Sequence, residues 1–282
     1  MDSVTVLIAA PGSGAISPEV VSRLDRAPRW LATGEAAEFP GLDLAVAKVA
    51  VAGLPIDVNV VPLANRHKKL LLADMDSTMI HQECIDELGV VAGVGDKIKG
   101  ITARAMRGEI DFEGALKERV ALLKGLDQSV IERLLRERIT FMEGGAALLS
   151  TMKHHGAHAA LVSGGFTAFT SHVAQALGFH ENHANTLLIS NGKLSGDVAR
   201  PILGKEAKVA ALKRISAARG IPHSDVLAVG DGANDIPMLL EAGMGVALHA
   251  KPAVQEQARF VINHGDLTAL LYLQGYSKSE FI

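Results

Sequence analysis

Several features that secreted, membrane-spanning and nucleic-acid-binding proteins require are scarce in this 282-residue chain. Its single cysteine, Cys84, excludes an internal disulfide framework and is typical of a reducing compartment. No apolar run reaches the roughly 18 residues that a membrane span needs, and the N-terminus lacks the regions of a signal peptide. The net charge of −3 gives no basic surface for nucleic acid. These absences predict a cytoplasmic protein that binds neither membranes nor nucleic acid.

Aromatic residues are also few, at 4% of the chain. Hydrophobic residues nevertheless make up 48% and charged residues 21%, which is typical of a globular protein with a substantial core. We therefore expect a core built from Leu, Val and Ala, with Cys84 as a small buried member of it. A chain of this length forms one large domain or two ordinary ones.

The most informative stretch is the one in which the apolar residues 70–73 run directly into Asp74 and Asp76. A short apolar run of this kind is typical of a strand that is buried on both faces of a parallel sheet. Ligands bind at the carboxyl ends of such strands, which is where Asp74 would lie. Residues two apart in an extended chain point to the same side, so the two carboxylates repel each other unless a cation or a shared proton intervenes. Taken alone, the stretch could equally be a solvated turn.

Residues 1–66 are expected to form a small α+β domain of the ferredoxin-like kind. Within it, Gly12-Ser13-Gly14 lacks the third glycine of a dinucleotide-binding fingerprint and is interpreted as a turn. The polar and basic residues 62–69 provide a linker to a second domain, 67–282. Strands are predicted at 4–10, 35–39 and 56–61, and helices from Ser17-Pro18 and over 42–51.

From residue 70 onward, strand patterns alternate with helix patterns, which predicts an α/β fold with a doubly wound parallel sheet. Asn191-Gly192 lies between two short strand-like runs and predicts a β-hairpin with a type I′ turn. Further strands are predicted at 157–162, 225–229, 245–248 and 260–262, and helices at 144–155, 169–177, 205–218 and 236–242.

One long segment interrupts this alternation. A helix is expected to begin at His81, and no strand pattern follows between about 88 and 140. Leu116, Val120 and Leu123 recur at helical spacing and form one apolar stripe. The segment is therefore interpreted as a helical cap that is inserted into the α/β domain after its first motif.

Three predicted strands end in residues that suit phosphoryl transfer. Carboxylates hold Mg²⁺, a Ser-Gly pair at a helix start offers a hydroxyl and backbone N–H groups to phosphate, and lysine supplies positive charge. Each feature alone is more often a turn or a solvated helix face, so it is their joint occurrence on one sheet that indicates the site. The residues are Asp74 and Asp76 after the first strand, Ser163 and Gly164 after the second, Asp231, Asn234 and Asp235 after the third, and Lys205 and Lys208 on the helix before the third.

Four motifs in this order resemble those of the haloacid dehalogenase-like superfamily. They are Asp74–Thr78, Ser163–Phe166, a lysine, and Gly230–Asp235. More narrowly, the first motif with Glu83 behind it and the segment Phe112–Leu123 resemble the phosphoserine phosphatases of that superfamily. The resemblance covers residues 70 to about 265 and is weak in the first 66.

The resemblance implies a role for each matching residue. Asp74 would be the nucleophile that takes the phosphoryl group, and Asp76 would protonate the leaving oxygen and then deprotonate the attacking water. Mg²⁺ would be bound by Asp74, by the backbone carbonyl of Asp76 and by Asp231. Lys205 competes with Lys208 as the phosphate-binding lysine, and the family's spacing to Asp231 favours Lys208. The phosphate contacts would come from Ser163, Gly164, Lys208 and Asn234, and Asp235 would support the metal ligands without binding the ion.

Residues of the cap would select the substrate. Phosphoserine presents an ammonium, for which Glu83 supplies an anion, and a carboxylate, for which Arg119 supplies a bidentate fork. Phe112 would pack over the bound ligand and exclude water. Lys117 is a rival for the carboxylate, although Arg119 fits the family's spacing after Phe112 better.

The expected function is therefore Mg²⁺-dependent hydrolysis of O-phosphoserine to serine and phosphate, the last step of serine biosynthesis. A phosphatase or phosphotransferase for another small phosphorylated metabolite, such as phosphohomoserine, is the alternative within the fold. An alternative of a different class is an amino-acid-sensing regulatory protein that acts through residues 1–66. The expected partner is a small-molecule substrate, and the sequence leaves the oligomeric state open, a homodimer included.

Overall fold

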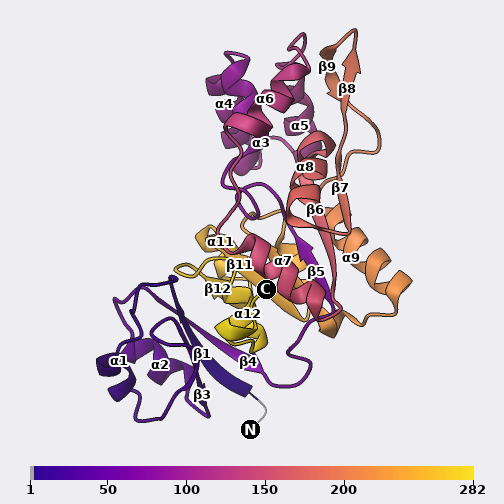
Figure 1. Ribbon diagram of the computed structural model, residues 1–282. Coiled ribbons are helices and arrows are strands. Elements are labelled where there is room, and N and C mark those ends of the chain that lie inside the picture. The colour runs from indigo at the N-terminus through magenta and orange to yellow at the C-terminus, as the bar shows by residue number, and fades with distance from the viewer. Residues whose placement is uncertain (1–2) are drawn as a thin grey trace.

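The computed structural model describes residues 3–282, and its centre is a six-stranded sheet in which all neighbouring strands run parallel (Figure 1). The strand order is β12-β11-β10-β5-β6-β7, so the strand before Asp74 lies near the middle and is fully buried. The α/β prediction is confirmed. The strands are β5 (Leu70–Ala73), β6 (His158–Phe166), β7 (Glu181–Asn185), β10 (Val226–Gly230), β11 (Met244–Leu248) and β12 (Phe260–Ile262).

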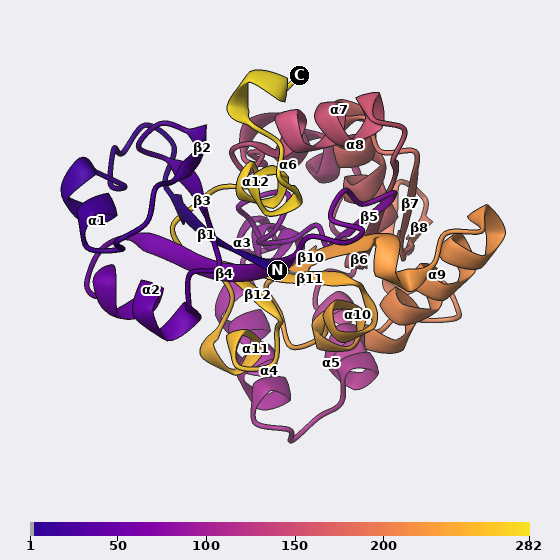
Figure 2. The same cartoon turned by 90° about the horizontal axis from the view of Figure 1, so that it is seen from below.

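Helices cover both faces of this sheet (Figure 2). Successive residues of a strand point to opposite faces. Leu70 and Leu72 accordingly pack against one set of helices, and Leu71 and Ala73 against the other. No helix of residues 3–282 is both long enough and apolar enough to cross a membrane. The first set is α9 (Lys205–Arg219), α10 (Ile236–Glu241) and α11 (Pro252–Gln255); the second is α7 (Gly145–His154), α8 (Thr167–Leu177) and α12 (Ala269–Gln274).

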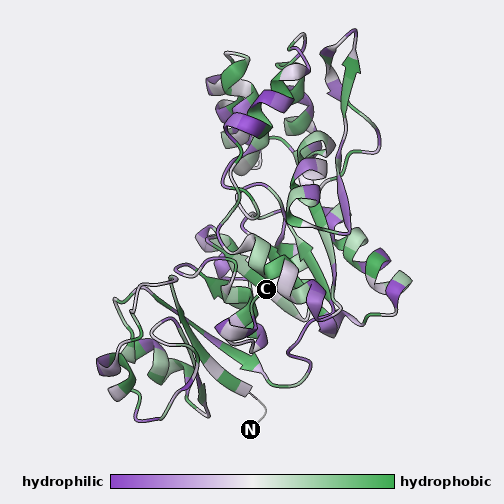
Figure 3. Ribbon diagram, viewed as in Figure 1, coloured by the Kyte–Doolittle hydropathy of each residue, from purple (hydrophilic) through white to green (hydrophobic). Residues whose placement is uncertain are grey.

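The predicted cap is present, but it is built from two separate segments of the chain. Its helices follow β5, and the hairpin of β8 (Leu187–Ser190) and β9 (Lys193–Val198) packs beside them (Figure 1). Asn191 and Gly192 both have positive φ, as the predicted type I′ turn requires. The cap helices carry hydrophilic as well as hydrophobic residues, whereas the central strands are largely hydrophobic (Figure 3). The helices are α3 (Cys84–Val91), α4 (Gly95–Met106), α5 (Phe112–Ala121) and α6 (Ser129–Glu137).

The N-terminal region forms an antiparallel sheet of order β2-β3-β1-β4, which is the order of a ferredoxin-like α+β unit. Ser17 caps the first helix and Pro18 opens it, as predicted. Both helices cover one face of the sheet, while Val4, Val6 and Ile8 on the other face pack into the same core as α12. The elements are β1 (Ser3–Ala9), α1 (Pro18–Ser22), β2 (Arg29–Ala32), β3 (Ala36–Pro40), α2 (Leu44–Ala50) and β4 (Ile56–Pro62).

Several elements differ from the sequence prediction. The helix expected from His81 begins only at Cys84, because His81 N–H donates to the Thr140 carbonyl at 3.1 Å and holds this segment outside the helix. Two strands, β2 and β7, were not predicted, because they lie at sheet edges and lack a continuous apolar pattern. The short helix α12 was also missed: it is buried on all sides and therefore has no amphipathic signal.

Candidate active site

The carboxyl ends of β5, β6, β10 and β11 face the cap, and a cavity of about 630 Å³ lies between them. The structure brings most of the predicted site residues together here, although they come from distant parts of the chain. The predicted residues that line it are Asp74, Asp76, Ser163, Gly164, Asp231 and Asn234 from the strand ends, and Glu83, Phe112 and Arg119 from the cap side.

Asp74 lies at the end of β5 and is only 5% exposed. Its Oδ1 atom accepts a hydrogen bond from the Met75 N–H at 2.8 Å and contacts Lys208 Nζ at 2.8 Å. Burial raises the pKa of Asp74 well above its usual value, and the charge of Asp235 adds to this, whereas Lys208 opposes it. The side chain is therefore held rigidly in a site where its negative charge depends on nearby cations.

Lys208 is the cation behind this carboxylate. It projects from α9, is 2% exposed, and its Nζ lies 2.6 Å from Asp235 Oδ1 as well as 2.8 Å from Asp74. Burial acts to lower the pKa of Lys208, but the two carboxylates outweigh it, so the pKa is raised and the ammonium stays charged. The rival Lys205 lies on the rim of the cavity with an exposed side chain that reaches Glu206 instead.

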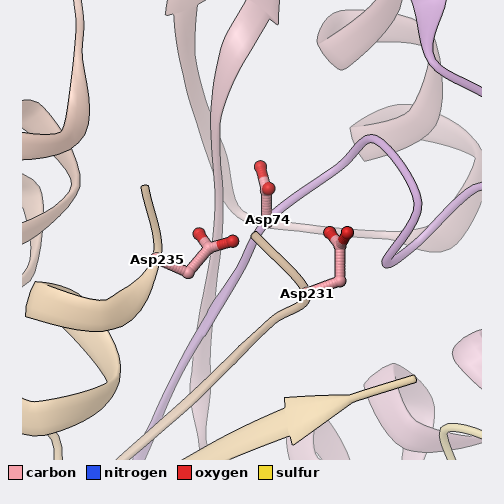
Figure 4. Close-up of side chains that lie close together, drawn as sticks. All are labelled: Asp74, Asp231 and Asp235. Carbon is pink, nitrogen blue, oxygen red and sulfur yellow. The ribbon is translucent and has the colours of Figure 1, made fainter. Parts of the chain in front are cut away.

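Three carboxylates converge beside this lysine: one oxygen each of Asp74, Asp231 and Asp235 lies within 4.8 Å of the others (Figure 4). Burial raises the pKa of Asp231 to about 6, and the charge of Asp235 adds to this, while a hydrogen bond from Thr78 opposes it. A single lysine cannot neutralise three acids, and carboxylate oxygens are the ligands that hard divalent cations prefer. The donor set therefore fits a metal ion.

The structure distinguishes the three acids by their hydrogen bonds. Both oxygens of Asp235 are occupied, one by Lys208 and the other by the Gly232 N–H at 3.0 Å. Asp235 is fully buried, and one of its oxygens lies within 4.8 Å of the other two acids, so distance alone does not separate it from them. Among the three, Asp74 and Asp231 have the less occupied carboxylates.

The side chain of Asp76 lies outside this cluster and points toward the cap side. Its Oδ1 accepts the Cys84 N–H at 2.9 Å, and its Oδ2 accepts the Ser163 hydroxyl at 3.3 Å. Burial raises the pKa of Asp76, and these hydrogen bonds oppose the rise. A carboxyl group with a raised pKa can hold a proton closer to neutral pH and release it again, as general acid–base chemistry requires.

Two opposite charges from the cap side face the cavity. Glu83 precedes α3 and accepts a hydrogen bond from Ser77 at 2.8 Å; burial raises its pKa to about 7, and Asp76 and Asp231 add to the shift. Arg119 on α5 is half-buried, and within residues 3–282 no carboxylate lies within salt-bridge distance of it. Its Nε donates to the Ala115 carbonyl at 3.2 Å and its Nη1 to the Thr102 hydroxyl at 3.4 Å, and the remaining N–H groups are available to an anionic ligand.

Lys117, the alternative to Arg119 for binding a substrate carboxylate, already forms an ion pair. Lys117 Nζ lies 2.5 Å from Glu113 on the exposed face of α5 and does not line the cavity. Phe112 begins the same helix, and its ring covers Gly164: a Cβ atom at that glycine would come within 3.0 Å of the ring. A side chain at position 164 would crowd this ring, so glycine allows the cap to approach the end of β6 closely.

Sequence reasoning missed three residues of this region. Asp86 lines the cavity from the first turn of α3, and Lys251 lines it just after β11. The buried Asn185 pins the Gly164 carbonyl at 2.9 Å and the Leu203 carbonyl at 3.1 Å. Lys251 could have been found, because it follows a predicted strand as Asp231 does. Asn185 follows no recognisable pattern, because its strand was not predicted.

Replacing Lys208 with Met should lower the free energy of unfolding of the metal-free protein by about 3–5 kcal/mol near pH 8, because two buried carboxylates lose their counter-charge. The loss should shrink near pH 5, because the pKa of Asp74, already raised, rises further in the variant and protonation removes the buried charge. Urea unfolding at both pH values measures this loss in the free energy of unfolding. Lys205→Met, on the exposed first turn of the same helix, should change stability by about 0.5 kcal/mol or less. Equal losses in the two variants would contradict the assignment.

Comparisons with known proteins agree with this geometry. The family model described as haloacid dehalogenase-like hydrolase matches residues 71–240. A phosphoserine phosphatase of Streptomyces coelicolor is 42% identical over 83% of this chain and 57% of its own length. One of Streptococcus thermophilus is 46% identical over 71% of this chain and 93% of its own. The chain spans 57–65% of the length of three of its curated relatives.

Solved structures share the architecture. A HAD family hydrolase from Salmonella enterica serovar Typhi superposes with a TM-score of 0.85 at 28% identity, covering 96% of this chain and 97% of that one. A substrate-bound phosphoserine phosphatase superposes with a TM-score of 0.68 at 41% identity, covering 73% of this chain and 97% of that one. This protein therefore belongs to the haloacid dehalogenase-like hydrolase family.

Proposed function

We propose that this protein is a Mg²⁺-dependent phosphatase that hydrolyses O-phosphoserine to serine and phosphate. The observation that carries the proposal is the meeting of Asp74, with Lys208 behind it, and the opposite charges of Glu83 and Arg119 in one cavity. The first pair suits attack on a phosphoryl group, and the second suits the ammonium and carboxylate of an amino acid. The relatives that are named as phosphoserine phosphatases support the same reaction.

Asp74 would perform the first chemical step. Lys208 and the Met75 N–H occupy Oδ1, which leaves the second oxygen to form a bond to phosphorus while the bond from phosphorus to the serine oxygen breaks. Asp76 would give its proton to that serine oxygen. Water then attacks phosphorus, Asp76 takes the proton of the water, and the bond between Asp74 and phosphorus breaks, which releases phosphate.

The remaining residues would hold the phosphate and its charge. The hydroxyl of Ser163, the N–H of Gly164, the side chain of Asn234 and Lys208 would bind phosphate oxygens. Asp74, Asp231 and the backbone carbonyl of Asp76 would hold Mg²⁺, which would supply positive charge against the two anions that must meet. Asp235 would keep Lys208 in place and support the metal ligands.

The cap would set the substrate class. Glu83 would bind the ammonium group and Arg119 the carboxylate, so an amino-acid phosphate fits this cavity better than a sugar phosphate does. Phe112 would close over the ligand at Gly164 and exclude water. The two charges do not fix the length of the amino-acid side chain, so phosphohomoserine stays the alternative substrate.

We further propose that residues 67–282, with the cap, form the catalytic domain and that residues 1–66 form a separate domain. Amino-acid sensing by residues 1–66 stays an alternative, and unchanged phosphatase kinetics with and without added serine would argue against it. A cytoplasmic location and a homodimer stay predictions as well.

A substrate panel tests the proposed function directly. We expect phosphoserine to be hydrolysed with the highest kcat/KM among phosphorylated amino acids and sugar phosphates, because Glu83 and Arg119 would bind its ammonium and carboxylate. We expect turnover to require added Mg²⁺, because the acidic cluster would hold the ion. Released phosphate is measured for each compound, with EDTA-treated protein as the control. Preference for a sugar phosphate would overturn the substrate assignment.

Asp74→Asn should lower kcat for phosphoserine by at least about 1,000-fold, because the amide cannot form the acyl phosphate. Acid quenching during turnover should trap phosphorylated protein in the wild type and none in the variant. Asp96→Asn, on the exposed first turn of α4, serves as the control and should retain activity. Substantial turnover by a folded Asp74→Asn protein would remove Asp74 from the nucleophile role.

Arg119→Ala should raise KM for phosphoserine by about tenfold or more, because it removes a charge-assisted pair with the substrate carboxylate. An aryl phosphate, which has no carboxylate, should show a much smaller change. Lys117→Ala on the same helix should affect neither compound, since that lysine pairs with Glu113. Equal effects of Arg119→Ala on both compounds would exclude carboxylate recognition.

A further inference from the structure

The N-terminal sheet meets the catalytic sheet along one strand edge, where β4 lies beside β12 (Figure 2). β12 is the edge strand of the parallel sheet, so its outward backbone groups lack a strand partner. Asn59 on β4 replaces that partner: its amide donates to the Val261 carbonyl at 2.9 Å and accepts the Val261 N–H at 3.0 Å. Residues 1–66 thus protect an edge of the catalytic sheet.

Asp57, two residues before Asn59 on the same face of β4, binds the turn that follows β12. Its carboxylate accepts three consecutive backbone N–H groups, from Asn263 at 2.8 Å, His264 at 2.9 Å and Gly265 at 3.0 Å. Asp57 is only 5% exposed, so these bonds are shielded from water. A single side chain of the N-terminal sheet therefore binds all three backbone N–H groups of turn 263–265.

This turn is hydrogen-bonded in its own right to the segment after β11. His249 donates its backbone N–H to the Ile262 carbonyl at 2.7 Å, and its Nε2 contacts the Gly265 carbonyl at 2.7 Å. Asn263 and Gln255 exchange amide hydrogen bonds at 2.9 and 3.1 Å. His249 has a φ of 48°, which a non-glycine residue adopts only when its surroundings hold it there.

The segment held in this way carries Lys251 into the active site. Gln255 also donates to the Ala250 carbonyl at 2.6 Å, and the Lys251 carbonyl accepts the first backbone hydrogen bonds of α11. Lys251 lines the cavity together with Asp231 and Asn234. A continuous set of hydrogen bonds thus runs from Asp57 through turn 263–265 to a lysine at the catalytic cavity.

The positive charge of Lys251 would help an anionic substrate to bind in this cavity. Five carboxylate side chains line the cavity, and a phosphate monoester is repelled by them before it binds. The cations among the described lining residues are Arg119, Lys205 and Lys251, and Lys251 is the one that follows β11. An ammonium at this rim offsets the repulsion on approach and in the bound state. The carboxylates are those of Asp74, Asp76, Glu83, Asp86 and Asp231.

We propose that Asp57 is a positioning residue for Lys251: residues 1–66 hold turn 263–265, and through it the segment 249–251 between β11 and α11, so that this ammonium stays in the lining of the cavity. The inference deepens the proposed function and rests on it for the identity of the substrate. On this proposal the N-terminal sheet contributes to substrate binding without itself binding a ligand.

Steady-state kinetics with phosphoserine test this coupling in the full chain. Lys251→Met should raise KM roughly fivefold with kcat nearly unchanged, and Asp57→Asn should raise KM in the same way but less. The double variant should be no worse than Lys251→Met alone, because both changes remove the same ammonium from the cavity. Multiplicative effects in the double variant, or an unchanged KM in Asp57→Asn, would overturn the proposal.

Thr5→Val is the matched control. The Thr5 hydroxyl donates to the Leu42 carbonyl at 2.6 Å, and this buried bond lies entirely within residues 1–66. The control should lose stability without a change in KM, so a KM shift in Thr5→Val would mean that general destabilisation explains the Asp57 result. Gln255→Leu breaks the same chain of bonds from the catalytic side and should reproduce the KM increase of Asp57→Asn even if that variant folds poorly.

Hydrogen exchange provides a readout that does not depend on turnover. Amides in residues 249–256 should exchange roughly tenfold faster in Asp57→Asn than in the wild type, with no such change in Thr5→Val. Unchanged exchange in this segment would overturn the positioning role, whatever the substrate. Failure of the wild type to hydrolyse phosphoserine would instead overturn the proposed function, and the exchange result would still decide the role of Asp57.

Discussion

The ion pairs that Lys208 makes with Asp74 and Asp235 are the interaction on which the rest of the active site depends. These three side chains come from α9, from the end of β5 and from the loop after β10, and all are almost completely buried. Buried charges of one sign are tolerated only when a counter-charge lies in contact with them. The lysine thus fixes the spacing of three elements and also leaves net negative charge in the acidic cluster, which is what favours a cation there.

The site divides into a chemical part and a selective part. Groups suited to phosphoryl chemistry lie at strand ends of the rigid sheet, where backbone hydrogen bonds fix their positions. Glu83 and Arg119 belong to the cap side, at the start of α3 and on α5, outside the strands of the sheet. The hairpin β8-β9 packs against α5 and so supports the helix that carries Arg119. This separation explains how one sheet can serve different phosphorylated substrates.

The N-terminal sheet is joined to the parallel sheet by a shared hydrophobic core and by hydrogen bonds. One of its faces shares a core with α12, and Asp57 and Asn59 satisfy the backbone groups at the exposed edge of the parallel sheet. An unprotected edge strand is a site of aggregation and of local fraying. The turn beside this edge is hydrogen-bonded to Gln255, which also binds the Ala250 carbonyl next to Lys251 at the cavity.

The sequence by itself determined the parallel sheet and the positions of Asp74, Asp76, Ser163 and Asp231, because apolar strands that end in polar residues are a local pattern. The family's spacing favoured Lys208 over Lys205, but only the tertiary structure supplied the physical reason: the two lysines lie three positions apart on one helix, and one is buried while the other is exposed. It also revealed that the predicted hairpin lies in the cap, the edge strands β2 and β7, and the path from Asp57 to Lys251. Those features depend on contacts between segments far apart in the chain, for which no local periodicity exists.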